Sequence, residues 1–347
     1  MRDDKRASEE ADFLRDAGWA AASRQHLAGD ASNRSYARLT GGPGGARAVL
    51  MDASPDKGED LFPFLAVGAE LQARGYSPPA TIAADLASGF ALIEDLGDDL
   101  FARVCASRPA VEETLYAAAV DLLAEIAATH APSSLVWNDR HTPLAPYDDT
   151  VFRREAALAV DWWRPAVTGE ITPADLREEF LDLISAATAD MATDVLVLRD
   201  YHAENLIWLP ARDGLRRTGL LDYQDALAGS PAYDLVSLLE DARRDTSSDL
   251  REAMIARFLE RSPETEAAAF HRDYAALGAQ RNLKIIGIFA RLWQRDGKEG
   301  YLALIPRVWD HLLRDLGHPS LAALRAFVLR WIPAPTPDAL NTMRAAR

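Results

Sequence analysis

Three oxygen-bearing side chains near the middle of the chain have the types and the spacing that phosphate chemistry requires. Asp200 and Asn205 follow the apolar segment 195–198, and Asp222 follows a second apolar segment at 219–221. Carboxylate and amide oxygens are the ligands that Mg²⁺ prefers, and a carboxylate can also orient an attacking hydroxyl. We therefore predict phosphoryl transfer, in which Asp200 accepts the hydroxyl proton while Asn205 and Asp222 hold magnesium on the nucleotide phosphates.

Each of these residues alone has an ordinary structural explanation. An Asp that follows a strand commonly closes the next turn by accepting a backbone hydrogen bond. The prediction therefore depends on all three residues together. None of them needs an unusual pKa, because phosphoryl transfer relies mainly on positioning and charge neutralisation.

The composition narrows the class of protein. The chain has 347 residues, 48% of them hydrophobic, which is enough for two domains or one bilobal unit. Its formal net charge of -15 argues against a nucleic-acid partner, because proteins that bind nucleic acids usually carry basic surfaces. Cys105 is the single cysteine, which excludes an intrachain disulfide and fits a reducing compartment.

The sequence also predicts a cytoplasmic protein with no membrane partner. Its first residues are too highly charged for a signal peptide, and no apolar run reaches the length of about 20 residues that spans a bilayer. The oligomeric state is left open.

The first part of the chain predicts a small, mostly antiparallel sheet that carries a helix. Alternating polar and apolar residues favour strands, and a glycine-rich breaker at 41–45 separates the first two. Helices are expected at 8–22 and 61–74, and strands at 36–40, 47–51, 81–85 and 89–95.

From residue 100 onward, the apolar residues recur at helical spacing. Helices are expected at 111–130, 151–163, 174–189, 233–244, 249–259, 264–296 and 301–316. We expect a break within 264–296, and the proline-rich segment 333–337 predicts the start of a poorly ordered tail.

Longer motifs connect these residues to a known family. Leu198-Arg199-Asp200 through Asn205, followed by Leu221-Asp222, resembles the catalytic and metal loops of the protein-kinase-like superfamily, and especially its aminoglycoside-phosphotransferase branch. The segments 222–227, 229–235, 281–287 and 295–298 resemble those of bacterial anomeric kinases that act on N-acetylmuramate and N-acetylglucosamine. The resemblance covers nearly the whole chain.

This resemblance implies an α+β, bilobal protein-kinase-like fold. A small antiparallel-sheet N-lobe at 1–96 would bind the nucleotide, and a mainly helical C-lobe at 97–347 would carry the catalytic loop and the sugar-binding helices. It also implies ATP and Mg²⁺ as cofactors, an amino sugar as substrate and a role in cell-wall recycling.

The resemblance further assigns residues to the nucleotide. Backbone groups of Glu94 and Leu96 would meet adenine at the hinge between the lobes. Ser32, Asn33 and Arg34 would form the nucleotide-positioning loop, although a plain β-turn explains that segment nearly as well.

On the substrate side, His202 and Glu204 would touch hydroxyls of the acceptor. Asp234 would support the backbone of the catalytic loop without taking part in the chemistry. Arg281, Lys284 and Arg291 are candidates to pair with a substrate carboxylate, but a solvated helix face is the default expectation for them.

One expected residue is missing from the N-terminal part. Family members usually carry a phosphate-binding lysine on the strand after the nucleotide loop, and here Met51 stands at that position. The cations that could replace the lysine are Arg34, Arg47 and Lys57. Glu59 and Glu70 are both possible acidic partners.

Two alternatives to the amino-sugar kinase therefore stay open. The acceptor could be another small alcohol, such as an aminoglycoside, choline or homoserine. The chain could also be a non-catalytic nucleotide-binding protein on a kinase-like fold, for which the missing lysine is the best argument.

Overall fold

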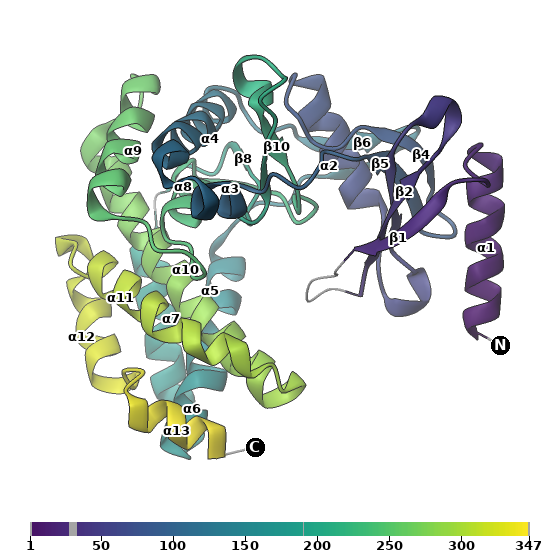
Figure 1. Ribbon diagram of the computed structural model, residues 1–347. Helices are drawn as coiled ribbons and strands as arrows, with labels where there is room; N and C mark the ends of the chain where they lie inside the picture. Colours follow the sequence, from purple (N-terminus) through teal and green to yellow (C-terminus); the bar gives the residue numbers. More distant parts are fainter. Residues whose placement is uncertain (1, 28–32, 190, 346–347) are drawn as a thin grey trace. The chain divides into compact units, whose positions relative to one another are not determined.

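The structure is a computed structural model that describes residues 2–27, 33–189 and 191–345 (Figure 1). The chain divides into two compact units. Unit 1 comprises Met1–Val111, Pro132–Leu144 and Glu204–Ala226, and unit 2 comprises Glu112–Ala131, Ala145–Ala203 and Leu227–Arg347. The predicted lobe boundary after residue 96 stays a prediction.

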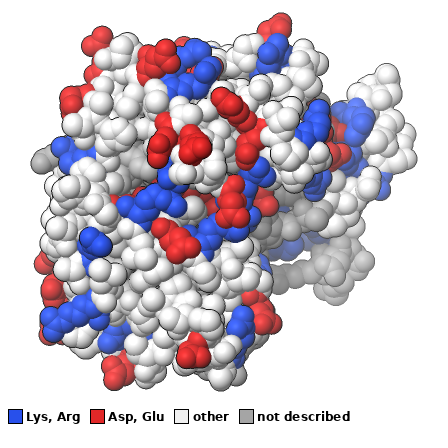
Figure 2. Space-filling model, turned by 60° about the vertical axis from the view of Figure 1, so that its left-hand side comes forward, with Lys and Arg blue, Asp and Glu red and all other residues white. Residues whose placement is uncertain are grey.

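Charged side chains of both signs are interspersed on the face shown in Figure 2, and neither sign forms a broad continuous area there. Among the helices that the structure describes, none is long and apolar enough to cross a membrane.

Unit 1 is built on a five-stranded antiparallel sheet. The strand order is β1-β2-β3-β5-β4. The strands are β1 (Ser23–Leu27), β2 (Ser35–Thr40), β3 (Ala48–Asp52), β4 (Thr81–Asp85) and β5 (Phe90–Glu94). The sequence predicted β2 to β5 but missed β1, because this edge strand is almost entirely polar and exposed and lacks the alternation of a half-buried strand.

Helix α1 (Arg2–Asp16) packs against one face of this sheet. Phe13 and Leu14 of the helix contact a cluster of buried residues: Trp19, Leu39, Ala48, Leu50, Phe90 and Leu92. The predicted helix at 8–22 was wrong at both ends: α1 begins at Arg2, and it ends at Asp16 because the chain turns at Gly18 (φ +78°). Trp19 N donates to Leu14 O and Gly18 N to Arg15 O, the bonding pattern of a Schellman C-cap.

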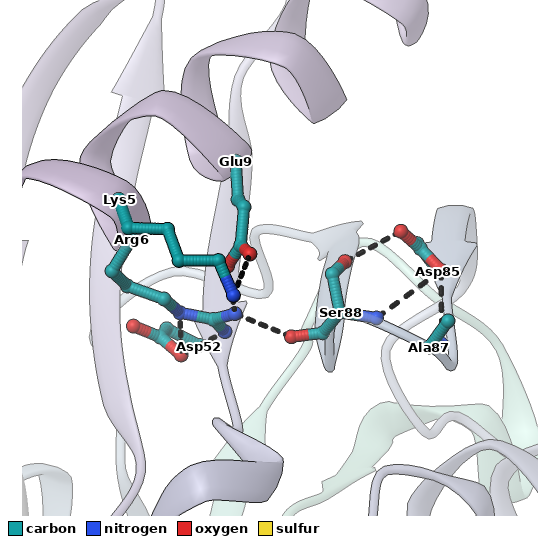
Figure 3. A network of polar contacts seen from close by, with 7 residues as sticks. All are labelled: Lys5, Arg6, Glu9, Asp52, Asp85, Ala87 and Ser88. Carbon is teal, nitrogen blue, oxygen red and sulfur yellow. Dashed lines mark hydrogen bonds and ion pairs between the residues drawn. The ribbon is translucent and has the colours of Figure 1, made fainter. Parts of the chain in front are cut away.

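A polar network fixes α1 on the sheet (Figure 3). The Arg6 guanidinium pairs with Asp52 at the end of β3, donates to Ser88 O at 2.5 Å and lies 3.7 Å above the Phe90 ring centroid. Asp52 therefore faces α1. Since successive strand residues point to opposite faces, Met51 faces the other side of the sheet.

Replacing Arg6 with Ala should destabilise the protein by about 1–2 kcal/mol, because it removes a partly buried ion pair and a cation–π contact together. Chemical denaturation measures this change. Arg15→Ala is the matched control on the same helix, because the Arg15–Asp12 pair is well exposed and should matter less. Equal effects of the two substitutions would contradict the anchoring role of Arg6.

The other elements of unit 1 lie outside the five-stranded sheet, and α2 packs against the segment around Asp222. They are α2 (Phe62–Ala73), α3 (Phe101–Ser107), β6 (Ser134–Trp137), β7 (Arg140–Pro143), β9 (Leu206–Trp208) and β10 (Thr218–Leu220). Phe64 of α2 stacks on Tyr223 with ring centroids 5.1 Å apart. A Cβ atom at Gly68 would lie 2.9 Å from the Tyr223 hydroxyl, so the close approach of α2 requires glycine there.

Unit 2 is mainly helical and is organised around the 30-residue helix α10 (Ala267–Asp296). The elements before it are α4 (Glu112–Ala127), α5 (Asp149–Leu158), a π-helical turn (Ala159–Trp163), α6 (Arg164–Thr168), α7 (Ala174–Thr188), β8 (Val195–Val197), β11 (Leu227–Gly229), α8 (Ala232–Leu239) and α9 (Ser248–Arg261). The helices after it are α11 (Ile305–Asp315), α12 (Ala322–Trp331) and α13 (Pro337–Ala345).

Two expectations about this unit were wrong. Helix α10 has no break, because its internal glycines serve packing: a Cβ at Gly287 would lie 2.2 Å from the backbone of Leu158. The segment expected to be a poorly ordered tail forms α13, which is anchored by buried Met343 and by a 3.0 Å hydrogen bond from Trp293 Nε1 to Met343 O.

Candidate active site

The predicted catalytic loop lies in unit 2, directly after β8, which pairs with β11. Its backbone takes an uncommon conformation, with φ +72° at Arg199. Asp234, in the first turn of α8, accepts hydrogen bonds from Leu198 N at 2.6 Å and Arg199 N at 2.8 Å. Ser237, one turn later, donates to Arg199 O at 3.1 Å. Helix α8 thus holds the residue before Asp200 in its left-handed conformation.

Burial determines the protonation state of the Asp234 carboxyl group. The Asp234 side chain is only 3% exposed, and burial raises its pKa to about 7 although two backbone N–H groups act in the opposite direction. The role predicted for Asp234, support of the catalytic-loop backbone without taking part in the chemistry, stays a prediction, and these two contacts are the observations in its favour.

The pKa of Asp234 implies a pH-dependent contribution to stability. The folded chain keeps this proton up to about pH 7, whereas the unfolded chain releases it near the ordinary value of 3.8. The contribution is therefore complete below that ordinary value and is lost as the pH rises through about 7.

Asp234→Asn cannot titrate, and it leaves one loop N–H without its acceptor. Its stability deficit relative to the parent should be larger at about pH 5 than at about pH 8, with the difference narrowing by about 1–3 kcal/mol between the two. Denaturant unfolding at both pH values measures this. A deficit that is constant or that grows with pH would contradict the raised pKa.

A second contact fixes the side chain of Arg199. Its guanidinium pairs with Glu155 of α5, and Lys284 of α10 lies 3.0 Å from the same carboxylate. The hydroxyl of Tyr147 donates to Glu155 and lies 2.9 Å from that of Tyr233. Burial acts to raise the pKa of Glu155, but Lys284 and Arg199 outweigh it, so the pKa is lowered and the carboxylate is ionised.

This network corrects the expectation of a solvated helix face. Arg281 is 6% exposed and donates to Ser237 Oγ at 2.8 Å, and Lys284, which is partly buried, pairs with Glu155. Sequence reasoning missed Glu155 and Ser237. The available signal was the presence of single charged or hydroxyl residues within otherwise apolar helical faces, which indicates buried partners.

His202 and Glu204, the predicted substrate contacts, have different environments. His202 is buried in unit 2, and burial lowers the pKa of its imidazole, opposed by the carboxylates of Asp241 and Asp200. Glu204 is exposed and belongs to unit 1. Their contact with a substrate stays a prediction.

The two predicted metal ligands lie together in unit 1. Strands β9 and β10 pair with Leu206 opposite Leu220, so Asn205 and Asp222 lie at the same end of this hairpin. Asn205 Nδ2 is 3.4 Å from Asp222 Oδ2, and Gln224 Nε2 donates to Asp222 Oδ1 at 2.9 Å. Asp222 also has positive φ, at +57°.

This arrangement fits magnesium. Among residues 2–27, 33–189 and 191–345, no group of three or more His, Cys, Asp or Glu could hold a metal by itself. A carboxylate with a neighbouring amide is the kind of partial ligand set that Mg²⁺ completes with phosphate oxygens and water. Gln224, which the sequence did not single out, orients the carboxylate of Asp222.

The predicted nucleotide contacts also belong to unit 1. Ser32 lies outside the described residues. Asn33 donates through its backbone N to Glu59 Oε1 at 3.3 Å and through Nδ2 to Lys57 O at 3.1 Å, and Arg34 pairs with Glu59 at 2.9 Å. This segment is therefore bonded to the chain ahead of α2.

At the predicted hinge, Glu94 donates through its backbone N to Ala80 O at 2.8 Å, and its carboxylate pairs with Arg212. Leu96 packs beside Gly219 of β10. Adenine contact at Glu94 and Leu96 stays a prediction.

Comparison with known proteins identifies the family. Residues 23–274 match the model of the phosphotransferase enzyme family. The chain belongs to this family. The predicted reaction class, phosphoryl transfer, is thereby confirmed, and the matched residues include the segment predicted to contact the nucleotide and the loops around Asp200 and Asp222.

Relatives of this phosphotransferase match it along nearly its whole length. It is 38% identical over 360 residues to the N-acetylmuramate/N-acetylglucosamine kinase of Caulobacter vibrioides, with 96% of this chain and 98% of that protein covered. It is 33% identical over 326 residues to the protein of the same name from Pseudomonas putida, with 90% of each covered.

A solved structure confirms the fold class. The ADP-bound aminoglycoside phosphotransferase APH(2″)-Ib superposes with a TM-score of 0.57 over 92% of this chain and 98% of that chain, at 14% sequence identity. The α+β, protein-kinase-like fold predicted from the sequence is therefore correct.

Proposed function

We propose that this phosphotransferase is an ATP- and Mg²⁺-dependent sugar kinase that phosphorylates the anomeric 1-hydroxyl of N-acetylmuramate, N-acetylglucosamine or both. The observation that carries the proposal is the full-length similarity to kinases named for these two sugars. The alternative acceptors are less well supported, because the aminoglycoside enzymes share the fold at only 14% identity.

The proposed reaction uses the residues as follows. Asp200 orients the 1-hydroxyl and accepts its proton while the sugar oxygen forms a bond to the γ-phosphorus and the bond from that phosphorus to the bridging oxygen breaks. ADP leaves with that oxygen. Asn205 and Asp222 would hold magnesium, which would neutralise charge on the phosphates.

Two structural observations support this division of roles. Arg199 and Asp222 are two of the three described non-glycine residues with positive φ, and both are held by specific side-chain contacts. Backbone strain of this kind typically persists where function requires it. Asp200 and Asn205 are also close along the chain, which joins unit 2 to unit 1 between Ala203 and Glu204.

The proposal places the protein in the cytoplasm, where ATP is available, and gives it a part in recycling cell-wall amino sugars. The similarity to the amino-sugar kinases supports this setting.

A coupled ADP-release assay across acceptors tests the substrate. We expect turnover with N-acetylmuramate or N-acetylglucosamine and little with kanamycin, choline or homoserine. Turnover only with one of the latter three would replace the amino sugar as the acceptor.

Asp200→Asn tests the proton acceptor. Turnover should fall by about 100-fold or more, because the amide cannot accept the hydroxyl proton, whereas ATP affinity should change little. Calorimetric titration with ATP supplies the second measurement. Unchanged turnover would remove Asp200 from its proposed role, and a parent protein that binds ATP but phosphorylates no alcohol would support the non-catalytic alternative.

A further inference from the structure

Strand β3 offers no cation at the position of the expected phosphate-binding lysine. Met51 stands there, it is 1% exposed, and it lies on the sheet face opposite α1 because its neighbour Asp52 pairs with Arg6 (Figure 3). A phosphotransferase still needs positive charge near the transferred phosphates. This need is sharper in a chain whose net charge is -15.

The neighbouring strand places an arginine beside this position. Tyr36 of β2 is the cross-strand partner of Met51, so the two side chains share one face of the sheet. Arg34 lies two residues before Tyr36, and its guanidinium hydrogen-bonds the Tyr36 side chain. Arg34 therefore lies on the face where the missing lysine would project.

A glutamate positions the side chain of Arg34, as a glutamate positions the phosphate-binding lysine of protein kinases. Its Nε lies 2.9 Å from Glu59 Oε2, and only 11% of the Arg34 side chain and 15% of the Glu59 side chain are exposed. Burial acts to lower the pKa of the guanidinium, but Tyr36 and Glu59 outweigh it, so the group stays charged. Protein kinases likewise position their phosphate-binding lysine with a glutamate.

Tyr36 also connects this pair to the proposed metal site. Burial raises the pKa of the Tyr36 hydroxyl, Arg34 lowers it, and the carboxylate of Asp222 raises it further. Tyr36 is thus within electrostatic reach of both Arg34 and Asp222, and all three residues belong to unit 1.

The two other candidate cations, Arg47 and Lys57, are less favourably placed to contact the phosphates. Arg47 precedes β3 at the end away from Met51, its side chain is 57% exposed, and it pairs with Asp95 at 3.0 Å. Lys57 is exposed.

We propose that Arg34, positioned by Glu59, supplies the phosphate-binding charge that other family members take from the lysine of β3. This inference rests on the proposed ATP-dependent function. It makes Arg34 a direct ligand of the nucleotide phosphates and Glu59 the residue that positions it. It also explains how Met51 can replace the lysine in an active kinase.

Calorimetric binding of a ligand series to the full chain tests the proposal, with ATP and ADP titrated in the presence of Mg²⁺ and adenosine as the phosphate-free probe. Arg34→Gln should weaken ATP binding by about tenfold or more and should also weaken ADP binding measurably, because a charge-assisted hydrogen bond is lost. The affinity for adenosine should stay unchanged. Arg34→Lys should keep most of the ATP affinity. Lys57→Gln and Arg47→Gln are the matched controls and should bind ATP as the parent does.

Binding of adenosine, which carries no phosphate, separates a lost phosphate contact from a general loss of the nucleotide site. The proposal is overturned if Arg34→Gln binds ATP like the parent, if it loses ATP and adenosine equally, or if the loss falls on Lys57→Gln or Arg47→Gln instead. No acceptor sugar is present, so the result is independent of the acceptor. A parent that binds ATP but phosphorylates no amino sugar would refute only the proposed function, and an unimpaired Arg34→Gln would refute only this inference.

Discussion

The position of the predicted catalytic loop depends on two hydrogen bonds from its backbone to one buried carboxyl group. Leu198 and Arg199 donate their N–H groups to the two oxygens of Asp234, and these bonds hold Arg199 at φ +72°. Without these two hydrogen bonds, the backbone of Arg199 would leave the left-handed region for a commoner conformation that is about 1–3 kcal/mol more stable. The side chain of Asp200 would then point in another direction. The ion pairs that Glu155 makes with Arg199 and Lys284 hold the side chain of the same arginine.

These supports come from segments far apart in the sequence. Asp234 lies in α8, Glu155 in α5, and Lys284 in the long helix α10. Each is a polar group within a helical face that is otherwise buried, and a charge buried without its partner is strongly destabilising. The helices of unit 2 therefore have two tasks, forming the core and fixing one short loop.

The sequence predicted what depends on local patterns and nearby motifs. Strands with clear alternation, such as β3 and β5, and helices with regular apolar spacing, such as α4, were found close to their observed bounds. The pairing of Asn205 with Asp222 was expected from their positions after two apolar segments, and the hairpin of β9 and β10 brings them together.

What escaped prediction depends on tertiary contacts. Strand β1 has no apolar pattern, and it is a strand because β2 provides a hydrogen-bonding edge. Helix α13 forms after a proline-rich segment because Met343 is buried and its carbonyl oxygen accepts from Trp293. The sequence could not single out Arg34 from Arg47 and Lys57, because the ion pair between Arg34 and Glu59 forms only in the folded chain.

The central claim is that Asp200 directs the anomeric hydroxyl of an amino sugar toward the γ-phosphate of ATP. The most direct measurement is ³¹P and ¹H NMR of the product formed from N-acetylmuramate and ATP. The account predicts a phosphate whose phosphorus couples to the anomeric proton, that is, a sugar 1-phosphate. A phosphate on any other hydroxyl of the sugar, or no phosphorylated sugar at all, would contradict it.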